Sequence, residues 1–534
     1  MESSLRRNPL GFAFVELVSV LALVCSGPAW AQTVAAAVPV SPAPKSAPTA
    51  PSKALLERAE VQKKLASLKS EAVKLQQSVG GASMTDVQAT RAAQSAMSRG
   101  DFIEAIAVLS APAQKGATGP AQDDLRLSLG KALVDAGMDA EAIELLKPLA
   151  ERPNLKDTAT GLANYHLLRL YYRNGDYPNA VAAYLRTRDR LPLAELTHAL
   201  YLAGNSYLRM KDHMRAVQAL DKVPPESEYF PFALYSSGLA YLSIGDAYSS
   251  TLLRFQALVE LQQQANPTVR QLIDRTHVTL GYFFVDQKRF GEAIEEFRKV
   301  EPESLYADQA RFGLGWAYLG MGECVKSIVM FDELTQRYTV SPYAREGWLN
   351  IGACYSKLNA YNKAVDSYRD ALDAYSAHRK VLKAVAEKVR SRNVSEWLRP
   401  PQTMPEGRDA PLPAGGKTPV APAALTLPKD DESWVWRDLL ANREVLDLTE
   451  LYNDARRTEQ VLASRAQSAS ESMAPAWKVR LGQAQAIRQD IERIIRQYVL
   501  EMIETSTQNV EDLALQANIG IAKNISVLVD NETR

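Results

Sequence analysis

The side chains best suited to metal or acid–base chemistry in this sequence are five histidines: His166, His198, His213, His277 and His378. None of them belongs to an H-E-x-x-H motif, and no group of Cys and His residues has the spacing of a zinc site. We therefore expect these histidines to be surface or packing residues, and we predict no metal site.

Two glycine-containing stretches resemble nucleotide-binding loops only superficially. Gly416, Lys417 and Thr418 imitate the end of a phosphate-binding loop, but Pro411 stands where that loop needs its first glycine. The glycines at 313, 315 and 320 lack the Rossmann spacing, and no Gly-x-Ser-x-Gly motif is present. The sequence therefore predicts no catalytic residue and no cofactor, and we interpret the chain as non-enzymatic.

The composition is that of a globular protein without a global electrostatic preference. The chain has 534 residues, of which 46% are apolar and 23% charged, and its 62 Lys and Arg residues balance its 62 Asp and Glu residues. A net charge of zero provides no field that would attract a polyanion. We accordingly predict no nucleic-acid partner.

A repeated pattern occupies residues 86–378. In each unit the starting residue is followed three positions later by an aromatic or apolar residue and seven positions later by Gly or a polar turn residue. Ala or Ser follows twelve positions after the starting residue in every unit, and an aromatic residue or Leu follows sixteen positions after it in most units. The starting residues are Ala93, Gly130, Leu168, Gly204, Gly238, Gly281, Gly315 and Gly352. The fifth unit departs from the pattern, because Arg254 takes its last position.

This pattern resembles the tetratricopeptide repeat, in which small residues let two antiparallel helices approach and a turn residue reverses the chain. One such helical pair cannot bury its own apolar face, so the resemblance implies that neighbouring pairs stack into a solenoid with a concave inner surface. The expected fold is all-α, with a tetratricopeptide-like solenoid of about eight helical pairs.

The residues expected to line the concave surface are mostly aromatic. They stand three positions before, or one position after, the starting residue of a unit: Tyr165, Tyr201, Asn205, Tyr235, Tyr282, Phe312, Trp316 and Leu349. Such a stripe would bind an extended peptide or an amphipathic helix of a protein partner. Two alternatives stay open: the rings could pack between adjacent helices, or the chain's own terminal helices could occupy the groove.

Helical segments and linkers flank the repeats. Residues 53–81 carry an apolar stripe that favours either a coiled coil or a helix that caps the first repeat. Residues 379–399 contain a basic helix, 400–429 form a Pro-rich linker, and 430–534 are expected to fold as a long helical hairpin that breaks near Met473. The N- or C-terminal helices could also mediate self-association.

The first 31 residues resemble a signal peptide, with Arg6 and Arg7 before an apolar run and a small-x-small site that ends at Ala31. A prepilin-like signal around Glu16, a lipoprotein signal at Cys25 and an uncleaved anchor are the alternatives. Residues 32–52 form an Ala/Pro-rich tether. Each alternative predicts export to the periplasm or cell envelope of a Gram-negative bacterium, with a membrane-proximal position possible.

Removal of the first 31 residues would leave two cysteines, Cys324 and Cys354. One disulfide is compatible with an oxidising compartment, but two buried thiols are the favoured interpretation.

These features predict an envelope scaffold or adaptor that binds partner proteins through the concave face, in an assembly for motility, secretion, division or outer-membrane biogenesis. Their combination is loosely similar to the Tol-Pal cell-division coordinator, although this chain has more repeats and an added C-terminal module. The alternative is a periplasmic chaperone or carrier that binds many apolar client peptides.

Overall fold

The computed structural model describes residues 53–79, 84–114, 119–152, 158–187, 191–244, 248–398 and 430–533. The predicted signal segment at 1–31, the tether at 32–52 and the linker at 400–429 lie outside the described residues. Within the described ranges every regular element is a helix, so the expected all-α fold is confirmed.

Eight helical pairs follow one another from α4 to α19, as the repeat pattern predicts. The first four pairs are α4 (Asp86–Ser98) with α5 (Phe102–Gln114), α6 (Pro120–Asp135) with α7 (Asp139–Ala150), α8 (Thr158–Arg173) with α9 (Tyr177–Thr187), and α10 (Leu193–Arg209) with α11 (His213–Leu220). The last four are α12 (Phe230–Ile244) with α13 (Tyr248–Glu260), α14 (Pro267–Asp286) with α15 (Phe290–Arg298), α16 (Ala307–Gly320) with α17 (Cys324–Arg337), and α18 (Pro342–Lys357) with α19 (Tyr361–Ser391). The short 3₁₀ helix η2 (Leu261–Gln264) follows α13.

The pairs hold together because a glycine on the first helix accommodates a large side chain from the second. A Cβ atom added at Gly281 would lie 2.5 Å from the Phe297 ring, and one at Gly352 would lie 2.6 Å from the Tyr368 ring. Such distances are far below van der Waals contact, so the two helices can approach closely only where the first residue lacks a side chain. Both large residues stand sixteen positions after their glycine, which confirms the spacing of the pattern.

The fifth unit differs from the predicted register by one residue. Phe255 packs on Gly238 and is fully buried, whereas Arg254 forms an ion pair of 2.6 Å with Asp221 at the surface. The pattern placed Arg254 in the last position because it assumed a constant spacing, but here the large residue comes seventeen positions after the glycine. The apolar ring takes the interior position because its burial is far more favourable than that of a guanidinium group.

In the seven units whose turn position is described, that residue adopts a left-handed backbone conformation. Gly100, Gly137, Gly175 and Gly322 have φ between 71° and 81°, and Lys211, Lys288 and Asn359 have φ between 58° and 61°. The next residue then donates its amide hydrogen back into the helix, as in the 2.9 Å bond from Asp101 N to Ala96 O. This arrangement satisfies carbonyl groups at the helix end and reverses the chain toward the second helix.

The last repeat helix, α19, is longer than the pattern predicts. The expected boundary between the solenoid and a separate basic helix, at residues 378 and 379, falls inside this continuous helix of 31 residues. Leu382, Val385 and Val389 remain buried beyond the boundary, so the apolar face that supports the helix does not end there. Trp397 follows in the short helix α20 (Val394–Trp397).

Four further helices lie outside the repeats: α3 (Lys53–Val79), α21 (Asp431–Ala441), α22 (Arg443–Ser468) and α23 (Ala474–Glu532). Helices α22 and α23 form the expected hairpin, and the chain reverses at residues 469–473, next to the predicted break. Helix α23 packs along α19, α22 and α3, and α3 also packs on α5. We call α3, α22 and α23 the terminal brace.

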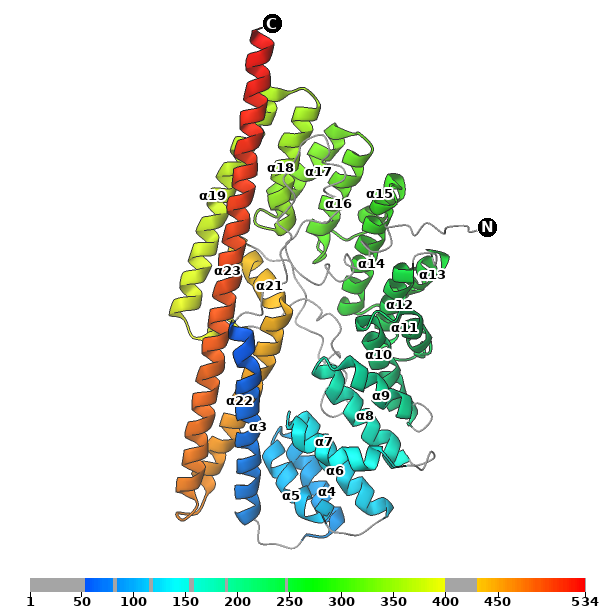
Figure 1. Cartoon of the computed structure of the whole chain (residues 1–534), viewed down its shortest axis with the longest axis vertical. Coiled ribbons are helices and arrows are strands. Elements are labelled where there is room, and N and C mark those ends of the chain that lie inside the picture. Colours follow the sequence, from blue (N-terminus) through cyan, green and yellow to red (C-terminus); the bar gives the residue numbers. More distant parts are fainter. Residues whose placement is uncertain are drawn as a thin grey trace, which may run out of the picture.

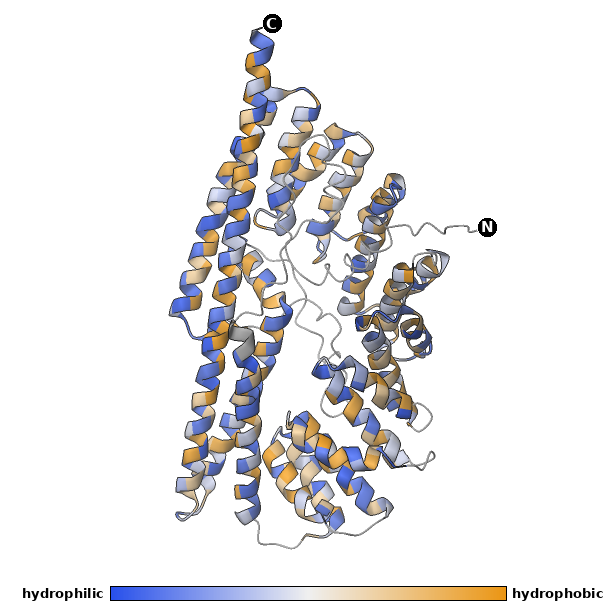
Figure 2. Ribbon diagram, viewed as in Figure 1, coloured by the Kyte–Doolittle hydropathy of each residue, from blue (hydrophilic) through white to orange (hydrophobic). Residues whose placement is uncertain are grey.

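Figure 1 shows the consequence of this packing. The repeats from α4 to α18 form an arc, and the terminal brace with α19 runs across the open side of that arc, from its first pair to its last. Apolar residues of the brace helices alternate with polar ones along their length (Figure 2). None of the described helices combines the length and the apolar character needed to cross a membrane.

Candidate protein-binding surfaces

The eight residues predicted to line the groove all lie on the first helices of their pairs, from α8 to α18. Seven of them are buried, with exposed fractions of 7% or less: Tyr165, Tyr201, Asn205, Tyr235, Tyr282, Phe312 and Trp316. Leu349 is only partly buried. In this structure the seven buried side chains do not form an open lining, and recognition of a partner by them stays a prediction.

Their contacts join one repeat to the next. The Tyr165 hydroxyl oxygen lies 2.8 Å from Nδ1 of His198, on the following first helix α10. The His198 ring stacks on Tyr229 at a centroid distance of 4.8 Å, and Tyr201 stacks on the same ring at 5.3 Å. Since Tyr229 immediately precedes α12, this cluster connects three consecutive repeats.

The same relation continues toward the C-terminal repeats. The Tyr282 hydroxyl donates a 2.9 Å hydrogen bond to the carbonyl oxygen of Gln309 on α16, and Phe312 lies 5.5 Å from the Tyr343 ring on α18. Tyr235 reaches Thr279 of α14 at 3.2 Å. These contacts agree with the alternative in which the rings pack between adjacent helices, because one aromatic side chain can contact two helices at once.

The polar member of the set also bridges two repeats. Nδ2 of Asn205 donates a 2.9 Å hydrogen bond to the carbonyl oxygen of Tyr201, and its Oδ1 accepts a 3.1 Å bond from the Ser236 hydroxyl. A buried amide needs such partners, because burial without them costs free energy. Asn205 therefore contributes to the packing of α10 against α12.

Helix α18 presents partly accessible side chains near the last predicted residue. Glu346 and Leu349 are three positions apart, so they share one face of the helix, and both are partly buried. Desolvation by burial raises the pKa of the Glu346 carboxyl group to about 7, against the lowering effect of neighbouring Arg345. This face thus combines an apolar side chain with a carboxyl group that titrates near neutral pH.

We predict that Glu346→Gln stabilises the protein at alkaline pH. A raised carboxyl pKa means that the folded state binds a proton more tightly than the unfolded chain, so stability falls as pH rises from the unfolded value of 4.5 to about 7. Partial exposure reduces the effect, and we expect a gain of about 2 kcal/mol at pH 8 and almost none at pH 4. Thermal unfolding of both proteins across this pH range tests it. Equal melting temperatures at pH 8 would contradict it.

A surface that the sequence did not reveal is the docking site of α21 on the last repeats. Trp434 of α21 packs edge-on against Tyr338 at a centroid distance of 5.5 Å. The Arg437 guanidinium stacks 3.9 Å from the Trp434 ring and lies 3.5 Å from the Asp308 carboxylate of α16. Both side chains are on one face of α21, three positions apart, but this spacing gives no indication of which helix they contact.

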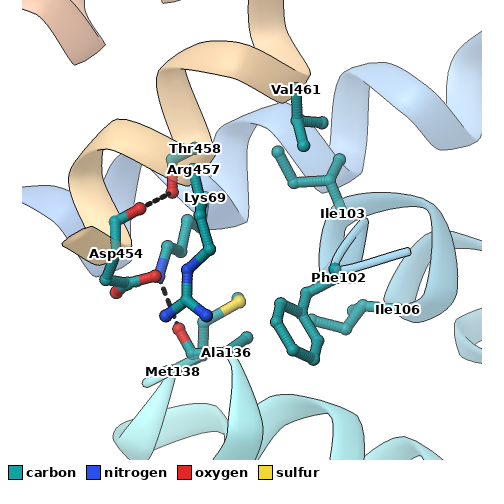
Figure 3. Close-up of a pocket in the computed structure, with 11 residues that line it drawn as sticks. Lys69, Phe102, Ile103, Ile106, Ala136, Met138, Asp454, Arg457, Thr458 and Val461 are labelled. Atoms are coloured by element: carbon teal, nitrogen blue, oxygen red, sulfur yellow. Dashed lines mark hydrogen bonds and ion pairs between the residues drawn. The ribbon is translucent and has the colours of Figure 1, made fainter. Parts of the chain in front are cut away.

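A second contact that the sequence did not reveal fastens the terminal brace to the first repeats (Figure 3). Lys69 of α3 is buried, and its Nζ donates 2.5 Å hydrogen bonds to the Asp454 carboxylate of α22 and to the carbonyl oxygen of Ala136. Ala136 caps the C-terminus of α6, where carbonyl groups lack helical partners and attract a cation. One ammonium group therefore joins three segments of the chain.

The recess beside Lys69 is too small for an organic ligand. Its volume is about 20 Å³, and its walls include Phe102, Ile103 and Val461. This volume matches a water molecule, whereas sites for drug-sized molecules occupy hundreds of Å³. We therefore treat this recess as part of the packing between the brace and the solenoid.

Burial suppresses the reactivity of the other candidate residues for chemistry, which are histidines and cysteines. Burial lowers the pKa of His166 and of His378 to about 3, so both imidazoles are neutral at physiological pH. Cys324 and Cys354 are buried free thiols, and burial raises the pKa of Cys354 to about 11. In the part of the chain that the structure describes, no three His, Cys, Asp or Glu side chains are grouped to hold a metal ion.

Comparison with known proteins identifies the repeats. Two family models described as tetratricopeptide repeat match residues 165–229 and residues 346–378. The first range extends from the middle of α8 to the residue before α12, and the second covers most of α18 and the first half of α19. No curated protein matches the chain.

Several solved structures are similar at low sequence identity. A tetratricopeptide repeat protein from Parabacteroides merdae is 17% identical, with a TM-score of 0.32, and the match covers 49% of this chain and 98% of that one. A signal transduction ATPase with a tetratricopeptide repeat sensor, from Pyrococcus horikoshii, is 11% identical with a TM-score of 0.28, and the match covers 73% and 52%. The Cut9-Hcn1 hetero-tetramer of the APC/C is 13% identical with a TM-score of 0.21, and the match covers 78% and 90%.

Proposed function

The chain contains tetratricopeptide repeats, and from this premise we propose that it is a non-enzymatic scaffold of the cell envelope whose arc of repeats holds one protein partner. The observation that carries the proposal is the closed arrangement of the arc and the terminal brace. Repeat proteins present extended surfaces to other polypeptides, and their curvature follows from small rotations between neighbouring units. A brace that joins the first and last pairs fixes this curvature and so preorganises the binding surface.

Within the proposal, the partner contacts the face of α18 that carries Glu346 and Leu349. Among the eight predicted groove residues, Leu349 is the one whose side chain is not already buried. The burial of the seven others also favours one specific partner over many apolar clients, because a general chaperone needs accessible apolar surface. Export to the envelope is proposed from the N-terminal sequence alone, and a role in motility, secretion, division or outer-membrane assembly belongs to the same proposal.

Site-specific photo-crosslinking in cells tests the proposed surface. We expect a photoreactive amino acid at position 349 to give one dominant protein adduct, and the same amino acid at position 325 to give none. Val325 is 63% exposed on α17 and serves as a matched control, because it is accessible but lies on another helix. Equal adduct patterns at the two positions, or no adduct at 349, would remove the face of α18 from the mechanism.

The location is tested separately in the same cells. If the first 31 residues direct export, an externally added protease digests the protein after the outer membrane is permeabilised, and deletion of these residues makes it resistant. Resistance of the full-length protein after permeabilisation would contradict the envelope location but would leave the scaffold function intact.

A further inference from the structure

A second candidate binding surface lies on helix α23, beyond the contacts of this helix with α3 and α22. Its C-terminal part packs on the last repeat with one face only. Ala517 is fully buried, and Tyr368 of α19 lies over Gly520, where an added Cβ would be 2.5 Å from the ring. The Asn524 side chain accepts a 2.9 Å hydrogen bond from Ser356 of α18. Figure 1 shows this part of α23 extending past the end of the arc.

The opposite face of the same segment is exposed and mostly apolar, with Asn518 and Ser526 as its polar residues. Leu515, Ile519, Ile525 and Val529 have exposed fractions of 60%, 45%, 41% and 51%, and Ala522 is also exposed. At 3.6 residues per turn these five side chains fall within roughly a third of the helix circumference. We call Leu515, Ile519, Ala522, Ile525 and Val529 the terminal stripe. Isolated exposed apolar residues are ordinary, but five of them on one face of a helix indicate an interaction surface.

The preceding turns of the helix show that this exposure is not a general property of α23. On the same face, before the terminal stripe, the exposed residues are Glu504, Gln508, Glu511 and Asp512, of which three are acidic. Glu511 lies 3.7 Å from Arg379, whereas Glu504 and Asp512 form no ion pair with any other described residue. The exposed face therefore changes from acidic to apolar within about three turns of helix.

This order of acidic and apolar residues disfavours parallel pairing with a second copy of the chain. Parallel pairing would place the acidic residues of both copies side by side. Like charges opposed across a helix pair are destabilising, and they act as a device against the wrong partner.

We propose that the terminal stripe docks an amphipathic helix of another protein, with the apolar face of that helix on the stripe and a basic segment beside Glu504, Glu511 and Asp512. An amphipathic helix provides apolar side chains at the spacing that covers such a row. The basic segment places positive charge opposite these acidic side chains, and this pairing fixes the orientation of the bound helix. The site is separate from the face of α18 and goes beyond the proposed partner of the arc.

Binding of two synthetic peptides to the full chain tests the inference. Both peptides are helical, with Leu or Ile at heptad spacing over three heptads, and they differ only in a terminal segment of three Lys or three Glu residues. We expect fluorescence anisotropy to report binding of the Lys peptide at least tenfold tighter than that of the Glu peptide, with the preference decreasing at high salt. Equal affinity for the two peptides would overturn the proposed role of the acidic turns.

Two variants locate the site. The triple variant Leu515→Ser, Ile519→Ser, Val529→Ser is expected to weaken binding of the Lys peptide at least tenfold, with unchanged helix content by circular dichroism. The control variant Val325→Ser, Val329→Ser removes two exposed apolar residues of α17 and should bind like the natural protein. Binding that the triple variant leaves unchanged would exclude the stripe.

Light scattering tests whether a second copy of the chain, and not another protein, covers the terminal stripe. A dimer of the natural protein that the triple variant abolishes would show that a second copy covers the stripe, and it would overturn the proposal. The photo-crosslink at position 349 should persist in the triple variant, so failure of this inference and failure of the proposed function give different results.

Discussion

Replacement of Lys69 by Ala is expected to detach α3 from the first repeats. The Nζ atom of Lys69 is the shared donor for the Asp454 carboxylate and the Ala136 carbonyl oxygen, and its removal leaves both acceptors inside the protein without this partner. The Asp454 side chain is 22% exposed, which moderates the cost of leaving a charge unpaired. We expect a loss of about 3 kcal/mol in the free energy of opening α3.

Hydrogen exchange measures this opening directly. Amides of α3 should exchange about 100-fold faster in the Lys69→Ala protein, while those of α14 to α16 keep their rates. A double variant, Lys69→Met with Asp454→Leu, is the matched control, because it replaces the buried ion pair with apolar side chains of similar size. It should recover most of the lost protection. Unchanged exchange in α3 after the single substitution would show that the lysine does not fasten the brace.

Replacement of Phe297 by Ala is expected to have the largest local effect within the arc. The ring is 1% exposed and lies between the glycines of two successive first helices, Gly281 on α14 and Gly313 on α16. Truncation to Ala would leave a cavity that neither helix can fill, because both contribute only backbone at this point. We expect a cost of about 4 kcal/mol, measured as faster amide exchange throughout α14, α15 and α16.

The complementary change, Gly313→Ala, tests the same packing from the other side. A Cβ atom at this position would collide with the Phe297 ring, and overpacking of this kind costs about 2 kcal/mol. Because the two residues are in contact, their effects should not add. The variant that combines Gly313→Ala with Phe297→Leu should be more stable than the sum of the single changes predicts. Strict additivity would mean that the ring does not fill the space between the glycines.

The repeat architecture could be predicted because its rules are local. Gly352 and Tyr368 are sixteen positions apart, and only the turn between their two helices separates them, so the spacing alone places one against the other. Gly100 and Gly175 could be assigned to turns because glycine adopts the left-handed conformation at little cost in free energy, whereas most other residues are disfavoured there. A local rule also fails locally: a single additional residue in the fifth unit put Phe255 where Arg254 was expected.

The sequence placed the predicted groove residues on the correct helices, but it did not predict how exposed their side chains are. Tyr165 and Tyr282 lie on the first helices of their repeats, as the pattern requires, yet their hydroxyl groups reach the following repeat. How closely successive repeats pack depends on the side chains of both units together. That property is not contained in the pattern of either unit alone.

By itself, the sequence determined an all-α chain of stacked helical pairs, the positions of its turns and the presence of a C-terminal hairpin, because each depends on residues within one or two helices of each other. Only the tertiary structure decided how the ends close the arc. The partners Lys69 and Asp454 are 385 positions apart, and Thr339 and Asp431 are 92 apart. Contacts at such separations depend on the accumulated curvature of eight repeats, to which every interface contributes, and no spacing in the sequence records that sum.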